Sequence, residues 1–512
     1  MKRSWLLLST LLILLSLAGP GASQEHPERA RPERPTTGEQ HPASRGPGVL
    51  SLLPSDAVSD HTLDARQGKL TYTATAGTLD LYEQSGERTA SIFYTAYVLK
   101  GGKAVNRPVT FVFNGGPGAA SAFLNLGVVG PKRLDFGPDG RDGARALLVD
   151  NPDSWIEFTD LVLIDPIGTG WSRAAKPDET AHFWNVRADA QSLAKVIALY
   201  LAHNGRTASP IYLMGESYGG FRAAKLARTL QEEQGLFASG IVMISPLLEG
   251  AFLFGGDRFA LGAALQLPSL AAAELERRHA FTPEALAGAE HFAMSEYLTT
   301  LAGPPPQGEQ AKAFYGRIAA MTGLPVDVVT NARGFIRSSY IKHAAASEHD
   351  VVSSYDASFA APDPFPDSEA RSHPDPILDG FVRAYGSAFV GYARDELGFK
   401  TDITYTLLAQ EASHRWDWMS DGGVWNLPSA SPDLRELLAL TPSFRTLIAH
   451  GYSDLVIPYA SDRYVIDHLP TIGAADRVVL KLYKGGHMFY LDGQSRTAFT
   501  QDARTFYRAS TE

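Results

Sequence analysis

The sequence predicts an α/β fold with a mostly parallel central sheet, helices on both faces and a helical cap insertion. Short continuous apolar runs indicate strands buried on both faces, as in a parallel sheet, and they cover residues 109–113, 161–164, 211–214 and 241–244. Apolar residues then recur at helical spacing over 186–202, which suits a helix that joins two parallel strands. Strand patterns pause after about residue 249 and return at 445–449 and 477–482, so an insertion interrupts the sheet.

The same patterns divide the chain into consecutive segments. Alternating polar and apolar residues over 69–101, broken by glycine-containing turns, indicate antiparallel hairpins before the parallel strands. Ala-rich helical stretches and Pro-rich loops replace strand patterns after residue 249. We therefore predict a signal peptide at 1–23 and a disordered Pro-rich linker at 24–49. The first part of the core follows at 50–249, a mainly helical cap insertion at 250–435, and the second part of the core at 436–512.

The first residues predict export from the cytoplasm. Lys2 and Arg3 precede an apolar run over 5–18, and small residues follow it, which is the pattern of a secretory signal peptide. We expect a periplasmic or secreted protein, with a retained N-terminal anchor as the alternative. No other run approaches the roughly 20 apolar residues that a membrane-spanning helix needs, so no span is expected after signal removal.

Composition narrows the chemistry that is available. The 512 residues carry a net charge of −10 and no basic block, which argues against nucleic acid or an anionic membrane as the main partner. The chain has no cysteine, which removes disulfides, thiol nucleophiles, thiolate zinc sites and iron–sulfur clusters. No cluster of metal-ligating residues is visible, so neither a metal nor an organic cofactor is expected. The oligomeric state stays open.

A serine within a glycine-flanked turn is the strongest chemical signal. The run Gly215-Glu216-Ser217-Tyr218-Gly219 follows an apolar strand and precedes a helix that extends to about residue 231. A sharp turn from strand to helix holds a serine in a strained conformation, and small neighbours let other chain segments approach it. This pattern predicts the nucleophile elbow of the α/β-hydrolase fold, with Ser217 as the nucleophile.

A serine hydroxyl needs a base and a carboxylate that orients the base. In this fold the order along the chain is Ser, then Asp or Glu, then His, each just after a strand. Asp454 follows the strand at 445–449, and His487 lies in a Gly-rich loop after the strand at 477–483. We predict these two residues as the acid and the base. Other carboxylates rank lower because none directly follows a strand: Asp462, Asp467 and Asp492.

A second glycine-rich loop follows the strand at 109–113. The run Asn114-Gly115-Gly116-Pro117-Gly118 is placed to supply a backbone N–H to a developing oxyanion. We predict that the N–H groups of Gly116 and Tyr218 form the oxyanion hole. A phosphate-binding loop is the competing interpretation, but the run lacks the glycine spacing and the lysine of a P-loop.

Several motifs together resemble the serine carboxypeptidases over roughly residues 65–510. They are the Asp454 and His487 segments and the runs 114–118, 151–155, 165–172 and 215–219. The resemblance implies that Asn114 and Glu216 bind the terminal carboxylate of the substrate. A glutamate beside a carboxylate repels it unless the two share a proton, so the resemblance implies best activity at mildly acidic pH. Without a substrate role, Glu216 is simply an acidic residue favoured at a helix start.

The sequence also departs from the eukaryotic pattern of that family. Val112 replaces a tryptophan, Ala119 replaces a cysteine, Val128 replaces a glutamate, and the disulfides are missing. The cysteine-free chain and the form of the signal peptide suggest a bacterial branch of the family. We expect a serine-type carboxypeptidase that hydrolyses the C-terminal bond of peptides with a free C-terminus through an acyl-enzyme. An esterase or acyltransferase with the same site, and a non-catalytic binding protein, are the alternatives. The aromatic segment 414–418 is expected to pack the cap, more than to line an acyl-side pocket.

Overall fold

The computed structural model describes residues 48–101, 107–137, 140–253, 256, 258–368, 374–420 and 427–509. The expected signal peptide at 1–23, and the expected linker up to residue 47, lie outside the described residues. The described residues form one compact unit. Within the described ranges, none of the helices combines the length and the apolar character that crossing a membrane requires.

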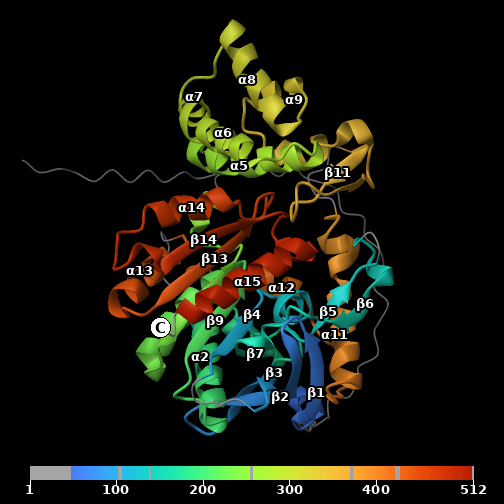
Figure 1. Cartoon of the computed structure of the whole chain (residues 1–512), viewed down its shortest axis with the longest axis vertical. Helices are drawn as coiled ribbons and strands as arrows, with labels where there is room; N and C mark the ends of the chain where they lie inside the picture. Colours follow the sequence, from blue (N-terminus) through green and yellow to red (C-terminus); the bar gives the residue numbers. More distant parts are fainter. Residues whose placement is uncertain are drawn as a thin grey trace, which may run out of the picture. The chain divides into compact units, whose positions relative to one another are not determined.

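Ten of the described strands form one large sheet, most of which is parallel (Figure 1). Its order is β1-β2-β3-β7-β4-β9-β10-β13-β14, and β8 pairs with β3. The first three strands pair antiparallel, and from β7 to β14 all neighbours are parallel. The strands are β1 (Ala57–Ala65), β2 (Gly68–Tyr82), β3 (Arg88–Leu99), β4 (Val109–Phe113), β7 (Asp160–Ile164), β8 (Arg173–Ala174), β9 (Ile211–Glu216), β10 (Ala238–Ile244), β13 (Arg445–Gly451) and β14 (Val478–Tyr483).

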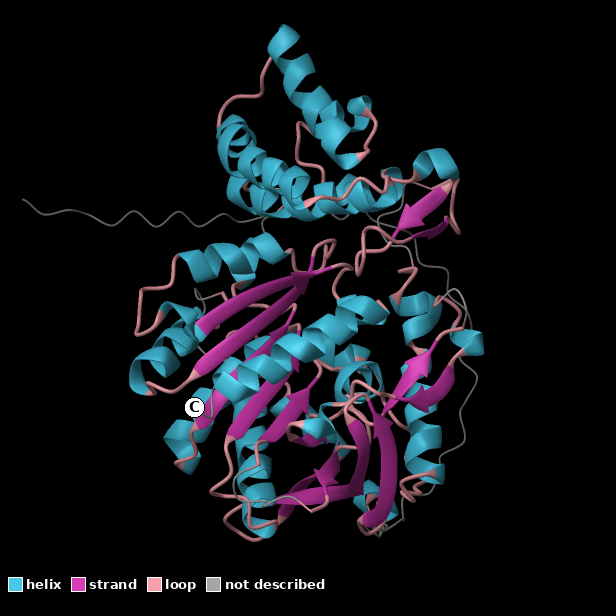
Figure 2. Cartoon of the chain, viewed as in Figure 1, coloured by secondary structure: helices cyan, strands magenta, loops and turns pink. Residues whose placement is uncertain are grey.

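Helices cover both faces of this sheet (Figure 2). Alternate residues of each parallel strand enter opposite cores: Val112 packs in one, and Phe111 and Phe113 in the other. One core is covered by α1 (Ala122–Leu124), α11 (Ala384–Asp395) and α15 (Gly493–Ala509). The other is covered by α2 (Val186–His203), α3 (Tyr218–Thr229), α13 (Ser431–Leu440) and α14 (Tyr459–Asp467). The predicted fold class is therefore confirmed, and burial on both faces explains the continuous apolar runs.

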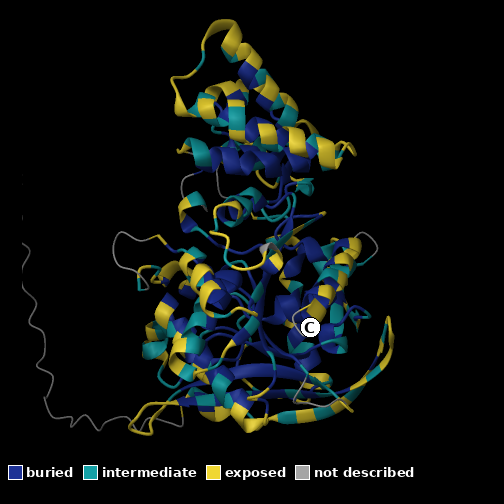
Figure 3. Cartoon of the chain, turned by 60° about the vertical axis from the view of Figure 1, so that its left-hand side comes forward, coloured by how far each residue is buried: buried dark blue, intermediate teal, exposed yellow. Residues whose placement is uncertain are grey.

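The cap has an apolar core of its own. Its elements are α5 (Ala260–Arg277), α6 (Pro283–Phe292), α7 (Leu298–Ala302), α8 (Gly308–Thr322), α9 (Val326–Asn331), α10 (Arg337–His343) and the hairpin of β11 (Asp350–Val352) and β12 (Ala360–Pro362). Figure 3 shows buried residues along the inner helix of the cap and exposed residues on its outer helices. The helix α5 packs on α14, and Tyr459 of α14 is buried against Ala272 and Leu286.

The last part of the expected cap range, 250–435, packs against the sheet. Phe389 and Tyr392 of α11 belong to the same apolar core as β4 and β9. Leu408 forms an isolated bridge with Ala119, so this segment reaches the loop after β4. A helical pattern in a sequence shows which face of a helix is buried, but not which element covers it. The sequence therefore gave no sign of this return to the core, nor of the β5–β6 hairpin (Lys132–Asp135 and Leu147–Asp150).

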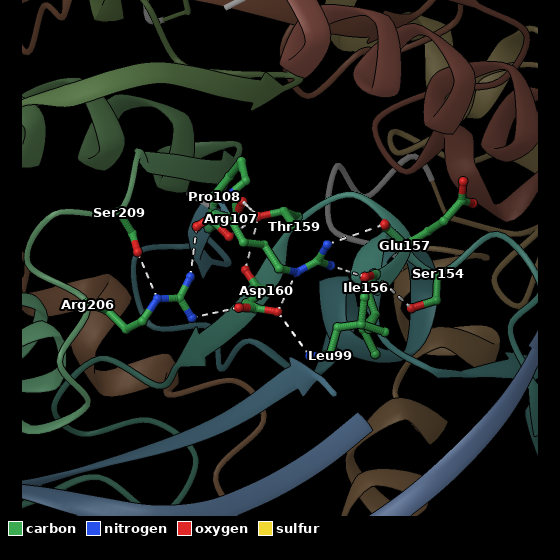
Figure 4. Close-up of polar contacts among 11 residues, drawn as sticks. Leu99, Arg107, Pro108, Ser154, Ile156, Glu157, Thr159, Asp160, Arg206 and Ser209 are labelled. Carbon is green, nitrogen blue, oxygen red and sulfur yellow. Dashed lines mark hydrogen bonds and ion pairs between the residues drawn. The ribbon is translucent and has the colours of Figure 1, made fainter. Parts of the chain in front are cut away.

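A buried ionic cluster lies at the amino ends of the parallel strands (Figure 4). Asp160, at the start of β7, is 1% exposed and lies between two guanidinium groups. Its Oδ1 accepts from Nε of Arg107 at 2.8 Å, and its Oδ2 accepts from Nη1 of Arg206 at 2.6 Å. Arg206 also donates to the carbonyl of Arg107 and to the hydroxyl of Ser209. The cluster thus ties together the chain segments that enter β4, β7 and β9.

Replacing Asp160 should destabilise the fold strongly. Asp160→Ala leaves two arginines at a buried site without their shared anion, so we expect the free energy of unfolding to fall by about 3 kcal/mol. Asp150→Ala is the matched control, because Asp150 is 57% exposed in its ion pair with Lys132 and should matter far less. Urea unfolding followed by circular dichroism measures both. Equal losses would contradict a structural role for the buried cluster.

Candidate active site

The turn between β9 and α3 places Ser217 in a strained conformation. Its φ is 60° and its ψ is −124°, in the region that residues with a side chain rarely adopt. Two glycines make the turn possible by close approach: a Cβ on Gly215 would lie 1.9 Å from the carbonyl oxygen of Gly219, and one on Gly219 would lie 2.7 Å from that of Phe113. The Ser217 N–H donates to Ile244 of the neighbouring strand at 2.9 Å. The predicted elbow is present, at the carboxyl ends of β4 and β9.

The predicted base and acid lie in hydrogen-bond contact. Nδ1 of His487 is 2.8 Å from Oδ2 of Asp454, and both side chains are buried. The other oxygen of Asp454 accepts the N–H groups of Val456 and Ile457 at 2.8 and 2.9 Å. Burial alone would lower the pKa of His487, but the adjacent negative charge of Asp454 outweighs it and the pKa is raised. With Nδ1 engaged, Nε2 is the nitrogen that remains for the serine hydroxyl.

Among the described contacts, none of the three rival carboxylates binds His487. Asp462 is buried and pairs with Nε2 of His450 at 2.7 Å. Asp467 lies exposed at the end of α14, and Asp492 accepts backbone N–H groups at the start of α15. Asp454 is the carboxylate among these four that contacts His487.

Five of the predicted site residues, Asn114, Gly116, Glu216, Ser217 and His487, line one cavity of about 120 Å³. Ser217 and His487 both line it, while Asp454 lies behind His487. The loop between β11 and β12 contributes Tyr355 to its wall: the ring of Tyr355 stands edge-on to His487 at 5.3 Å, and its carbonyl accepts the His487 N–H at 2.5 Å. The full lining is Asn114, Gly115, Gly116, Ala119, Phe123, Glu216, Ser217, Tyr355, Leu378, Leu408, Val456, His487 and Met488.

The two predicted oxyanion donors belong to adjoining loops. Gly116 lines the cavity, and Tyr218 is the first residue of α3. The loops are in close contact, because a Cβ on Gly115 would lie 2.7 Å from the nitrogen of Tyr218. The ring of Tyr218 points the other way and packs edge-on against Trp416 and Trp418 at 5.2 and 5.3 Å. The aromatic segment 414–418 therefore packs behind the elbow and does not line the cavity.

Asn114 and Glu216 form a hydrogen-bonded pair at the cavity wall. Nδ2 of Asn114 donates to Oε2 of Glu216, and Oδ1 of Asn114 accepts the N–H of Leu124 at 3.0 Å. Glu216 is 4% exposed, and burial raises the pKa of its carboxyl to about 7. The attraction of His487 and hydrogen bonds from Tyr490 and Asn114 oppose this rise, and the charge of Asp454 adds to it. Glu216 can thus carry a proton near neutral pH.

Sequence reasoning missed several side chains that hold this pair. The hydroxyl of Tyr490 lies 3.0 and 3.1 Å from the two oxygens of Glu216. Arg222 of α3 donates to the carbonyl of Asn114 and pairs with Asp189 of α2 at 2.7 Å. The position of Tyr490, three residues after His487, was the one available signal. For Arg222 and Asp189 no local signal existed, since each lies inside an ordinary helical pattern.

Three residues that depart from the eukaryotic family pattern lie in or near the cavity wall or the core. Val112 and Val128 are fully buried in the apolar core, and Ala119 lines the cavity itself.

In the part of the chain that the structure describes, no three His, Asp or Glu side chains gather closely enough to hold a metal ion.

The fold and the site together define the class of α/β serine hydrolases. The serine carboxypeptidase family model matches residues 68–242. Pheromone-processing carboxypeptidase kex1 of Neosartorya fischeri is 30% identical over 153 residues, and that of Aspergillus niger is 33% identical over 129 residues. These matches cover 29% and 25% of this chain, and 22% and 19% of the two relatives. A solved structure of proline iminopeptidase from Mycobacterium smegmatis aligns over 85% of this chain and 98% of its own, with 14% identity and a TM-score of 0.38.

The matched segment, residues 68–242, is similar to the serine carboxypeptidase family, which is the resemblance that the motifs predicted. The matched segment holds β2 to β10, with the elbow, Asn114, Gly116 and Glu216. The chain spans about a fifth of the length of these curated relatives. Asp454 and His487 lie beyond the matched segment, so their assignment rests on their geometry.

We expect Ser217 to react covalently with a fluorophosphonate probe. The native protein should be labelled, because His487 lies in the same cavity and is held by Asp454. Ser217→Ala should abolish labelling, and Asp454→Asn should slow it by roughly a thousandfold by disturbing the imidazole tautomer. Asp467→Asn is the control, because this carboxylate is exposed at the end of α14, and it should label at close to the native rate. Native protein that fails to react, or unchanged labelling of Ser217→Ala, would rule out this nucleophile.

Proposed function

We propose that this protein is a serine-type carboxypeptidase that removes the C-terminal residue of peptides. The observation that carries the proposal is the Asn114–Glu216 pair, which opens into the same cavity as Ser217 and His487. A buried carboxyl whose pKa is about 7 can donate a hydrogen bond to an anion at mildly acidic pH. The pair is therefore suited to hold the free carboxylate of a substrate beside the nucleophile.

The proposed reaction uses the residues in familiar roles. Oγ of Ser217 attacks the carbonyl carbon of the last peptide bond, and Nε2 of His487 takes the hydroxyl proton and passes it to the leaving amine. Asp454 holds the imidazole and stabilises its positive charge. The N–H groups of Gly116 and Tyr218 stabilise the oxyanion. Water, activated by His487, then hydrolyses the acyl-enzyme and releases the shortened peptide.

The first test compares a free with an amidated C-terminus. Blocked dipeptides that end in leucine suit the assay, since apolar side chains such as Phe123, Leu378 and Met488 line the cavity. We expect kcat/KM to be higher for the free acid by at least about tenfold, because the amide cannot form the charge-assisted contact. Equal rates would instead indicate an esterase or acyltransferase that uses the same site, and no turnover despite labelling would indicate a substrate of another class.

The pH dependence should differ between the two substrates. Above about pH 7 Glu216 loses its proton and repels a substrate carboxylate, so kcat/KM for the free acid should fall as the pH rises. The amidated peptide should keep its rate there. On the acid side both substrates should lose rate as His487, whose pKa is raised, becomes protonated. Parallel profiles for the two substrates would contradict a proton on Glu216 as the basis of recognition.

We also propose that the protein acts outside the cytoplasm, in the periplasm or beyond. The support is the basic, then apolar, then small-residue pattern of residues 1–23. Cell fractionation with antibody detection tests it, and a cytoplasmic product that still carries residues 1–23 would disprove it.

A further inference from the structure

We propose that Tyr490 is a positioning residue, whose hydroxyl fixes the Glu216 carboxyl in the orientation that receives the terminal carboxylate of the substrate. This inference rests on the proposed carboxypeptidase function and extends it to a residue outside the Ser-Asp-His set. Because Tyr490 lies three residues after His487, one short turn would carry both the predicted base and the residue that orients Glu216.

The contact of Tyr490 with Glu216 is made to both oxygens of the carboxyl. Its hydroxyl lies 3.0 Å from Oε1 and 3.1 Å from Oε2, and the side chain is fully buried. Burial raises the pKa of the phenol well above its usual range, so Tyr490 keeps its proton and acts as a donor. Since Asn114 donates to Oε2 as well, Glu216 is held from two sides and its carboxyl plane is set.

The ring of Tyr490 is itself locked in place. It comes from the short helix η12 (Phe489–Leu491), and a Cβ on Gly127 would lie 2.8 Å from its Cε2 atom. The backbone carbonyl of Tyr490 accepts Nη1 of Arg496 at 3.1 Å. Gly127 lies just after Leu124, whose N–H binds Asn114. One buried segment thus supports both groups that contact Glu216.

The other titratable groups around this contact come from several elements. They are His487, Asp454, Tyr355 from the segment after β11, Tyr385 of α11 and Arg496 of α15. The attraction of His487 lowers the pKa of Glu216, and the repulsion of Asp454 raises it. All of these groups remain when only the hydroxyl of Tyr490 is removed, so a changed pH profile reports on that hydroxyl.

Tyr490→Phe should raise KM for a peptide with a free C-terminus but not for a peptide with an amidated C-terminus. Losing the donor frees the Glu216 carboxyl to rotate, so we expect KM for the free-acid dipeptide to rise about tenfold with kcat within about twofold. KM for the amidated dipeptide should not change. The lost hydrogen bond favoured the charged form of Glu216, so its pKa rises, and the alkaline fall of kcat/KM should move up by about one pH unit.

Two further variants make the result specific. Tyr483→Phe is the matched control: it removes another buried phenol, seven residues earlier, that donates to Asp502 at 2.8 Å and not to Glu216. It should change neither KM nor the pH profile. Replacing Tyr490 by 3-fluorotyrosine keeps the ring and makes the hydroxyl a stronger donor, so the alkaline fall should move to lower pH. This second variant tests the inference even if Tyr490→Phe does not fold.

The outcomes distinguish this inference from the function on which it rests. If the native enzyme does not discriminate free acid from amide, the proposed carboxypeptidase function fails. If the native enzyme discriminates but Tyr490→Phe and the fluorotyrosine variant leave the KM ratio and the alkaline limb unchanged, the positioning role of Tyr490 is wrong. Unchanged fluorophosphonate labelling of each variant shows that the nucleophile remains intact.

Discussion

The close packing of backbone at the β9–α3 elbow is the constraint on which the rest of the site depends. Ser217 keeps a positive φ because the chain on either side has no side chain at Gly215 and Gly219. The same lack of side chains lets the loop after β4 approach the elbow, which brings Gly116 and Asn114 to the cavity. The positions of the predicted nucleophile, of the predicted oxyanion donors and of the Asn114–Glu216 pair therefore all depend on this one turn.

Two buried carboxyl groups in this site have opposite surroundings. Asp454 accepts two backbone N–H groups on one oxygen, and its other oxygen contacts Nδ1 of His487. Among the described residues, the side chains of Asn114 and Tyr490 donate to Glu216, and burial dominates, so its pKa is raised to about 7. The difference suits one group to stabilise an imidazolium and the other to share a proton with an anion.

The buried ionic cluster and the candidate active site lie at opposite ends of the parallel strands. The ionic cluster around Asp160 joins the amino ends of β4, β7 and β9, while Asn114 and Ser217 follow the carboxyl ends of β4 and β9. The cap contacts the candidate active site through Tyr355, whose carbonyl accepts the backbone N–H of His487. Variation in the cap can therefore reshape the cavity without disturbing the cluster that ties the strands together.

The sequence by itself determined the fold class and located the strand-to-helix turn at Ser217 and the two candidate partners, Asp454 and His487, that the structure brings into contact. Continuous apolar runs such as 109–113 report burial on both faces, and a residue just after a strand must lie at the sheet edge. Only the tertiary structure decided that Asp462 pairs with His450, that α11 returns to the sheet and that Tyr490 and Arg222 hold the Asn114–Glu216 pair. These contacts join elements far apart in the chain, and local pattern carries no information about which buried polar group meets which.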